Sequence, residues 1–363
     1  MARRLRSKRL RLQAVRSATF SLLAGILIFG GSARLRDLIL RLGWPGWSSV
    51  AVYLAILFGI FAAAELPFAY IGGYRWERTG GLSNQTLAGW LKDRGKSFVL
   101  GLFATVVAGG VLLWLIATTP WWWLFAWGLG LAVSVVLGFV TPIVLVPLFY
   151  RLQPLRDASL RARFESLAAR ARVPVVGVFE LQASAKTRRS NAAVMGFGRT
   201  RRIVVTDTLL RDFPPDEIET VLAHELAHQR SMDPIRAFLL ESVVSLGVLA
   251  ATAWLYIATI PEFGVTQGAD MAGVPLLAVL FSLAALPFRP IELRWSRSRE
   301  ARADRFALDL TGHPEAFAAA MVRLHDRNLG VAHPRTWEKW LFYSHPSGRD
   351  RIEAARAFPT RRA

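Results

Sequence analysis

The chain has 363 residues, of which 53% are hydrophobic, and it combines a mean hydropathy of +0.32 with a formal net charge of +19. So apolar a composition argues against a typical soluble protein of this length, whereas apolar segments with basic flanks are typical of integral membrane proteins. A nucleic-acid-binding protein would also be basic, but here the basic residues border apolar segments, so we expect a lipid bilayer and no nucleic acid as partner.

Six apolar stretches are long enough to cross a bilayer as helices, which takes about 20 residues each. In chain order they lie at residues 17–33 and 42–64, twice within the charge-free run 97–150, from about Ala237 to Ile260, and from about Met271 to Phe288. Thr119-Pro120 marks the turn inside the charge-free run. The first stretch also has the pattern of a cleaved signal peptide, with Gly31-Ser32-Ala33 after its apolar middle, and this alternative stays open.

Basic loops indicate the cytoplasmic side of a membrane protein. One set of connecting segments is basic, namely the N-terminus, loop 75–96 and the segments after Tyr150 and Phe288. The alternate set, 120–121 and 261–270, carries few charges or none. This alternation predicts six spans with both chain ends in the cytoplasm. Arg34, Arg36 and Arg41 depart from it in the first outer loop, and we expect them on a short amphipathic segment at the interface.

The spans divide the chain into four parts: 1–150 with four spans, 151–235 of water-soluble character, 236–290 with two spans, and 291–363, again water-soluble. By the loop count both water-soluble parts face the cytoplasm and can form one split domain. Within 151–235, Ser159–Ala171 has helical spacing, Val173–Phe179 and Arg202–Thr206 are β-branched runs typical of strands, and Gly196-Phe197-Gly198 indicates a hairpin turn. The predicted fold is mainly α, a polytopic membrane helical bundle with a split cytoplasmic α+β domain.

The run HELAH at residues 224–228 carries the strongest chemical signal. Pro214-Pro215-Asp216 predicts a helix start, and His224 and His228, four residues apart, then lie on one face of that helix, where they can bind one zinc ion. Glu225 can reach a water on that ion without being a ligand. Because the chain has no cysteine, any zinc must be held by histidine and carboxylate. The alternative interpretation is a helix with a solvated histidine pair.

A zinc peptidase needs a third protein ligand and an open fourth position. Glu300 and Asp304 lie four residues apart on one face of the helix predicted after the sixth span. Glu300 can complete the set of ligands, and Asp304 can accept a hydrogen bond from a ligating histidine. Taken alone, this run is typical of a solvated charged helix; beside HELAH we favour the metal site. Four other histidines are further candidates: His313, His325, His333 and His345.

With these residues in place, the sequence resembles the membrane metallopeptidases of the CAAX prenyl endopeptidase type, whose more distant relatives are the HtpX-like quality-control proteases. Four features carry the resemblance, over about residues 60–355. They are HELAH with Glu300-Ala301-Arg302-Ala303-Asp304; Ser190-Asn191-Ala192 with the run 202–209; Ser344-His345-Pro346 with Arg351-Ile352; and Gly81-Leu82-Ser83-Asn84-Gln85-Thr86 with Trp90-Leu91-Lys92-Asp93 and Lys96. The last feature is typical of the prenyl protease branch.

The resemblance implies an integral, multi-pass zinc metalloendopeptidase with a zincin-like domain. Together with the loop count, it leads us to expect a bacterial inner-membrane protein with its site on the cytoplasmic side. It implies hydrolysis of a peptide or membrane-protein substrate that binds extended, next to a strand near Asn191. The implied roles are as follows: one zinc ion on His224, His228 and Glu300, Glu225 as general base, Asp304 behind a ligating histidine, and His345 and Arg351 as catalytic residues that stabilise the oxyanion.

Two departures from the family pattern leave the substrate open. Ala193 stands where the family usually has an aromatic residue, and we count six spans where the prenyl protease branch commonly has seven. The alternatives are a processing peptidase of the CAAX type, an HtpX-like quality-control protease, and a non-enzymatic membrane scaffold or transporter. Glu65 and Glu241 are the only charges that suggest transport, and the intact HELAH run with Glu300 argues against an inactive protein.

Overall fold

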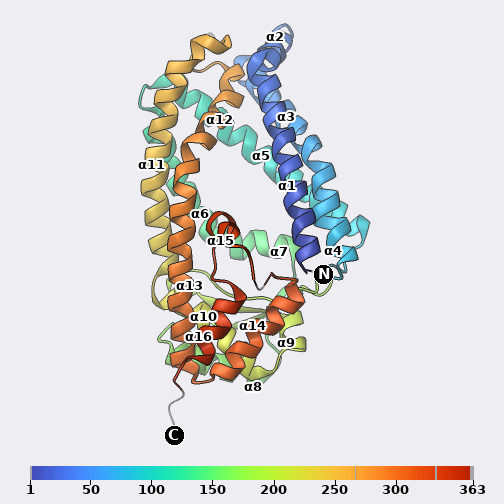
Figure 1. Ribbon diagram of the computed structural model, residues 1–363. Helices are drawn as coiled ribbons and strands as arrows, with labels where there is room; N and C mark the ends of the chain where they lie inside the picture. Colours follow the sequence, from blue (N-terminus) through green and yellow to red (C-terminus); the bar gives the residue numbers. More distant parts are fainter. Residues whose placement is uncertain (1, 266, 332, 360–363) are drawn as a thin grey trace.

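The computed structural model describes residues 2–265, 267–331 and 333–359, and it places a tall bundle of helices above a smaller region of helices and strands (Figure 1). Six helical stretches of the described chain are long and apolar enough to cross a membrane: Arg4–Leu40, Gly46–Thr79, Leu87–Thr118, Trp122–Phe149, Asp233–Phe263 and Met271–Thr311. Each predicted stretch overlaps one of them, so the predicted count of six is confirmed.

Several of these stretches contain more than one helix. Between α1 (Ala2–Ile26) and α2 (Ser32–Leu40) the chain bends at Phe29 and Gly30, and the φ of 118° at Gly30 is one that glycine adopts readily. The remaining helices of the bundle are α3 (Gly46–Phe68) leading into α4 (Trp76–Thr79), α5 (Leu87–Thr118), α6 (Trp122–Val140) leading into α7 (Val146–Phe149), α11 (Asp233–Thr259), and α12 (Val274–Ala285) leading into α13 (Arg289–Thr311). The sixth span and the helix that carries Glu300 are therefore one continuous stretch.

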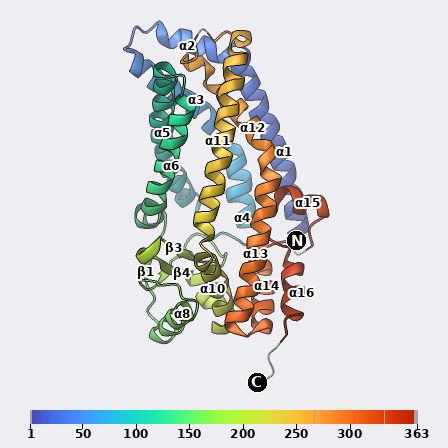
Figure 2. The same ribbon diagram turned by 90° about the vertical axis from the view of Figure 1, so that its left-hand side faces the viewer.

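The basic residues of the first outer loop lie on α2 or directly after it. Arg36 forms an ion pair with Asp270 from the third outer loop, with side chains 14% and 4% exposed. In addition, the Ser32 hydroxyl donates a hydrogen bond to the carbonyl of Ala272 and lies 2.6 Å from the hydroxyl of Tyr53. These contacts join α2 to the segment between α11 and α12 (Figure 2). Arg36, which departs from the predicted alternation of basic and uncharged loops, therefore pairs with an acidic side chain at the same end of the bundle.

Four strands form a mixed sheet in the order β1-β2-β4-β3: β1 (Leu152–Pro154), β2 (Val178–Leu181), β3 (Ala192–Met195) and β4 (Arg202–Thr206). Strand β4 pairs in parallel with β2 and antiparallel with β3. The strand predicted at 202–206 and the hairpin turn before it are confirmed. The strand predicted for Val173–Phe179 is wrong over its first five residues, because Pro174 has no N–H to donate to a ladder and Gly177 has a φ of 151°.

Six further helices lie outside the candidate spans: α8 (Ala158–Arg170), α9 (Asp207–Asp212), α10 (Pro215–Arg230), α14 (Pro314–Asn328), α15 (Thr336–Phe342) and α16 (Gly348–Arg356). The first three of them pack against the sheet. One hydrophobic core joins Phe164, Leu222 and Leu226 to Phe317 and Met321. The segments before α11 and after α12 therefore share a core, although two spans separate them in sequence. Helix α10 packs along α13, which brings the HELAH run next to Glu300 (Figure 2).

Candidate metal centre

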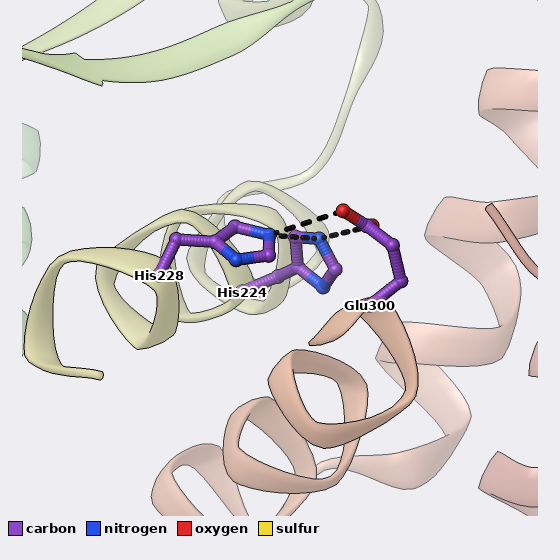
Figure 3. Close-up of side chains that lie close together, drawn as sticks. All are labelled: His224, His228 and Glu300. Carbon is purple, nitrogen blue, oxygen red and sulfur yellow. Dashed lines mark hydrogen bonds and ion pairs between the residues drawn. The ribbon is translucent and has the colours of Figure 1, made fainter. Parts of the chain in front are cut away.

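Helix α10 carries the HELAH run. It begins at Pro215, a position where the missing N–H of proline is tolerated, and Asp216 and Glu217 in its first turn suit the positive end of the helix dipole. Leu222 and Leu226 are fully buried in the core on one side of the helix. This packing fixes the rotation of α10, so that His224 and His228 project together toward Glu300 of α13 (Figure 3).

The Nε2 atoms of His224 and His228 and the carboxylate group of Glu300 form a small triangle, which we call the donor triangle. The two Nε2 atoms of His224 and His228 lie 3.3 Å apart. Glu300 places Oε2 3.2 Å from Nε2 of His224 and Oε1 3.4 Å from Nε2 of His228. With bonds of about 2.0 to 2.1 Å to a tetrahedral zinc ion, two such donors would lie about 3.3 Å apart. The residues therefore fit one tetrahedral ion, to which they supply three of four positions.

Two more carboxylates fix the orientation of the imidazole rings. Asp304 Oδ1 lies 2.8 Å from Nδ1 of His224, and Asp233 Oδ2 lies 2.8 Å from Nδ1 of His228. Because an ionised carboxylate only accepts hydrogen bonds, each Nδ1 must carry a proton, so Nε2 is the nitrogen of each ring that can bind an ion once it has lost its own proton. Burial would lower the pKa of His224, but Asp304 and Glu300 outweigh it and raise the pKa to about 9.

Sequence reasoning missed Asp233. It lies five residues after His228, as the first residue of α11, and Met232 before it adopts a left-handed φ of 53° that turns the chain between the two helices. The turn folds the carboxylate back onto the ring of His228. An acid directly after the HELAH helix was the available signal, but the sequence does not reveal the turn that brings it close.

His345 and Arg351 come from the loop before α16 and from α16 itself. The Nδ1 atom of His345 donates to Oε2 of Glu300 at 2.6 Å, and its side chain is 58% exposed. Arg351, whose side chain is 13% exposed, donates through Nε to Oδ2 of Asp304 at 2.8 Å, with a second bond from Nη2 to Oδ1. His345 therefore contacts a candidate ligand, while Arg351 contacts the carboxylate that orients His224.

Glu225 and Asn191 border a cavity of about 380 Å³ beside the donor triangle, which is also lined by Ser190, Ala192, His224, His345 and Arg351, among others. Burial raises the pKa of Glu225, and the nearby His224 and His228 oppose this effect. Asn191 is exposed and directly precedes β3, an edge strand of the described sheet. The structure thus gathers all eight residues named from the sequence around one site.

Three convergent donors, a partly buried glutamate and an open cavity, at one end of a six-span bundle, define an integral-membrane metallopeptidase with an HExxH helix. The chain belongs to peptidase family M48, whose model matches residues 154–358. The model of the N-terminal region of CAAX prenyl proteases, described as five membrane helices, matches residues 2–151. The described part of that segment has four candidate spans. The expected family, enzyme class and membrane fold are confirmed, and zinc is the metal typical of this family.

Several curated proteins are similar over most of the chain. An uncharacterized metalloprotease of Bacillus subtilis, YhfN, is 31% identical over 311 residues, covering 84% of this chain and 72% of its own. The CAAX prenyl protease 1 homolog of Homo sapiens is 26% identical, over 95% of this chain and 84% of its own. The crystal structure of S. mikatae Ste24p has the same fold, with a TM-score of 0.82 and 22% identity over 96% of this chain and 87% of that one.

Proposed function

We propose that this metallopeptidase is a zinc endopeptidase in which His224, His228 and Glu300 hold one zinc ion. The donor triangle carries the proposal. Its edges of 3.2 to 3.4 Å suit tetrahedral zinc, and two histidines with one glutamate form a ligand set that catalytic zinc sites use. The cavity that Glu225 lines adjoins these donors and would leave room for a water and a scissile carbonyl beside a bound ion.

When bound, the zinc ion supplies a Lewis acid for the carbonyl and lowers the pKa of the attacking water toward about 7. Glu225 acts as the general base: it accepts the proton of the attacking water and returns it to the leaving amine. Because burial raises the pKa of Glu225, its carboxyl group can hold the proton between these two steps.

His345 and Arg351 complete the machinery in different ways. His345 is the more exposed of the two and borders the cavity, so we assign it the hydrogen bond to the oxyanion that forms on the substrate. Arg351 holds Asp304, and through it the ring of His224, and its charge favours the oxyanion from behind. Asp233 has the corresponding orienting role for His228.

The substrate is a peptide or membrane protein that binds in extended form along β3. An edge strand can accept a further strand through its main chain, and the cavity extends to Ser190, Asn191 and Ala192 at the start of β3. Several relatives are named CAAX prenyl protease 1 homologs, which supports a C-terminal processing peptidase of that type. The quality-control alternative predicts cleavage of unmodified, unfolded proteins instead.

We place the site on the cytoplasmic side of a bacterial inner membrane. The N-terminal arginines, loop 75–96 and the basic segment after Phe288 lie toward the end of the bundle that carries the peptidase region (Figure 1). Such a gathering of basic residues is typical of the cytoplasmic face. Reporter fusions to the C-terminus and to loop 261–270 test this: a cytoplasmic signal from the loop would contradict the orientation.

The experiment compares the purified protein with Glu225→Gln, using a prenylated peptide that ends in a CAAX sequence, the same peptide without the lipid, and casein. We expect one zinc ion per chain in both proteins, and cleavage that the parent loses on chelation and that Glu225→Gln reduces by about 10²-fold or more. Unreduced turnover by Glu225→Gln would exclude its role as base. Preference for casein over both peptides would favour the quality-control function.

A further inference from the structure

A short loop of the membrane bundle is paired with the peptidase region. We call residues 80–86, between α4 and α5, the support loop, and residues 182–191, between β2 and β3, the approach segment. Ser83 and Thr187 form an antiparallel bridge. On either side of it, the N–H of Asn84 donates to the carbonyl of Lys186 at 3.1 Å, and the N–H of Arg188 donates to the carbonyl of Leu82 at 2.9 Å.

Two carboxylates of the bundle strengthen this pairing. Glu77 of α4 accepts from Arg189 at 2.9 and 3.0 Å and from Arg9 of α1. Asp93 of α5 binds the ammonium group of Lys186 and accepts from the side-chain amide of Gln85 at 2.6 Å. The side chains of Glu77, Asp93 and Lys186 are only about one-fifth exposed, so these pairs are less screened than surface ion pairs.

The other side of the approach segment is held by the peptidase region itself. Asp207 accepts from the N–H groups of Ala183 and Ser184, and the Thr208 hydroxyl donates to the carbonyl of Arg189 at 2.7 Å. The segment ends at Asn191, where β3 begins and the cavity opens. The position of this end therefore depends on contacts from both regions of the molecule.

A connection of this length, with no helix or strand of its own, would otherwise be free to fluctuate. Peptide hydrolysis requires the scissile carbonyl at a fixed place, and an error of about 1 Å can cost about 10²-fold in rate. A substrate that adds to β3 takes its register from the backbone at Asn191. Movement of the approach segment would therefore move the substrate relative to the donor triangle.

We propose that Glu77 and Asp93, together with the support loop, are positioning residues of the peptidase, through which the membrane bundle sets the place of the substrate strand. This inference rests on the proposed function, since it assumes that substrate binds along β3. It also gives a role to the run Gly81–Thr86 with Asp93, which the metal centre leaves unexplained. These side chains act through Lys186 and Arg189 without touching the substrate.

The test uses the whole 363-residue chain with Glu225→Gln, which should bind peptide without cleaving it, and a fluorescent prenylated CAAX peptide. Asp93→Asn and Glu77→Gln keep side-chain shape but remove the charge. We expect each to weaken peptide binding about tenfold, while zinc content stays at the parent value. Glu165→Gln, an exposed carboxylate on α8, is the matched control and should bind the peptide as the parent does. Unchanged binding by both Asp93→Asn and Glu77→Gln would overturn the inference.

A rescue experiment covers the possibility that these variants fold poorly. The chain has no cysteine, so Ser83→Cys with Thr187→Cys introduces a single pair at the bridge. The disulfide should restore tight peptide binding to Asp93→Asn, and reductant should remove the gain; a disulfide that forms without restoring binding refutes the positioning role. If the parent protein binds zinc but no peptide along β3, the proposed function is wrong. If the parent binds the peptide and the variants bind it equally well, only the positioning role is wrong.

Discussion

Replacing Asp233 by asparagine tests how the ligand rings are held. The carboxylate lies 2.8 Å from Nδ1 of His228 and is 5% exposed. Asparagine keeps the size of the side chain and can still accept through its oxygen, but it carries no charge. The substitution therefore removes the charge-assisted part of one buried hydrogen bond and leaves the three donors of the triangle in place.

Asp233 is a cleaner position for this test than Asp304. Asp304 is also bound to Arg351, so its replacement would leave a buried guanidinium without its carboxylate as well as disturb His224. Losing an orienting partner of a ligating histidine typically costs about 10- to 100-fold in metal affinity, or about 1.4 to 2.7 kcal/mol. We expect Asp233→Asn to weaken zinc binding within this range.

The assay is competition for zinc against a chelator of known affinity, with the purified protein in detergent. Asp216→Asn is a suitable control, because that carboxylate lies on α10, the helix that carries His228, is 60% exposed and pairs with Arg163. The control should bind zinc as the parent does. Parent-like zinc affinity in Asp233→Asn would refute the idea that Asp233 sets the orientation of His228.

Three further predictions follow from the same contacts. Glu300→Ala should lose most bound zinc by elemental analysis while Glu225→Gln keeps it, and full occupancy would remove Glu300 from the ligand set. Because Asp304 and Glu300 raise the pKa of His224 to about 9 in the metal-free protein, zinc must displace a proton from this ring at lower pH. Zinc affinity should therefore rise about tenfold per pH unit between about pH 6 and 8. A zinc affinity that does not change with pH would contradict a protonated His224. Arg36→Met removes an ion pair whose side chains are 14% and 4% exposed, so it should lower the unfolding temperature without changing zinc content, and an unchanged temperature would show that the Arg36–Asp270 pair contributes little.

The parts of the fold that follow from one-dimensional patterns were predictable. A span needs only a long apolar run, so six spans could be counted from the sequence, and the histidine pair needs only a spacing of four on one helix. Both signals are local. The strand predicted for Val173–Phe179 shows the limit even of local reasoning, because Pro174 and Gly177 interrupt a run whose composition favours a strand.

Contacts that depend on the path of the chain were harder to predict. Asp233 reaches His228 only because Met232 adopts a left-handed conformation, which β-propensity or helical spacing does not encode. Arg351 was predicted at the site from the family resemblance alone, and only the packing of α16 near Asp304 explains what it contacts. Asp93 lay within a recognised run, but its partner Lys186 is 93 residues away and belongs to another region.

The order of the ligands along the chain links the metal site to the membrane bundle. His224 and His228 precede α11, whereas Glu300 follows α12, so the donors meet only when these two helices have crossed and returned. The core supports the same closure, because Leu222 and Leu226 of α10 share it with Ala307 and Leu308 of α13. An ion that binds all three donors therefore stabilises the arrangement in which α11 and α12 bring Glu300 back to His224 and His228. The stabilisation equals the free energy of ion binding. On this argument the metal has two roles, in the chemistry at the cavity and in holding both halves of the peptidase region against one hairpin of the bundle.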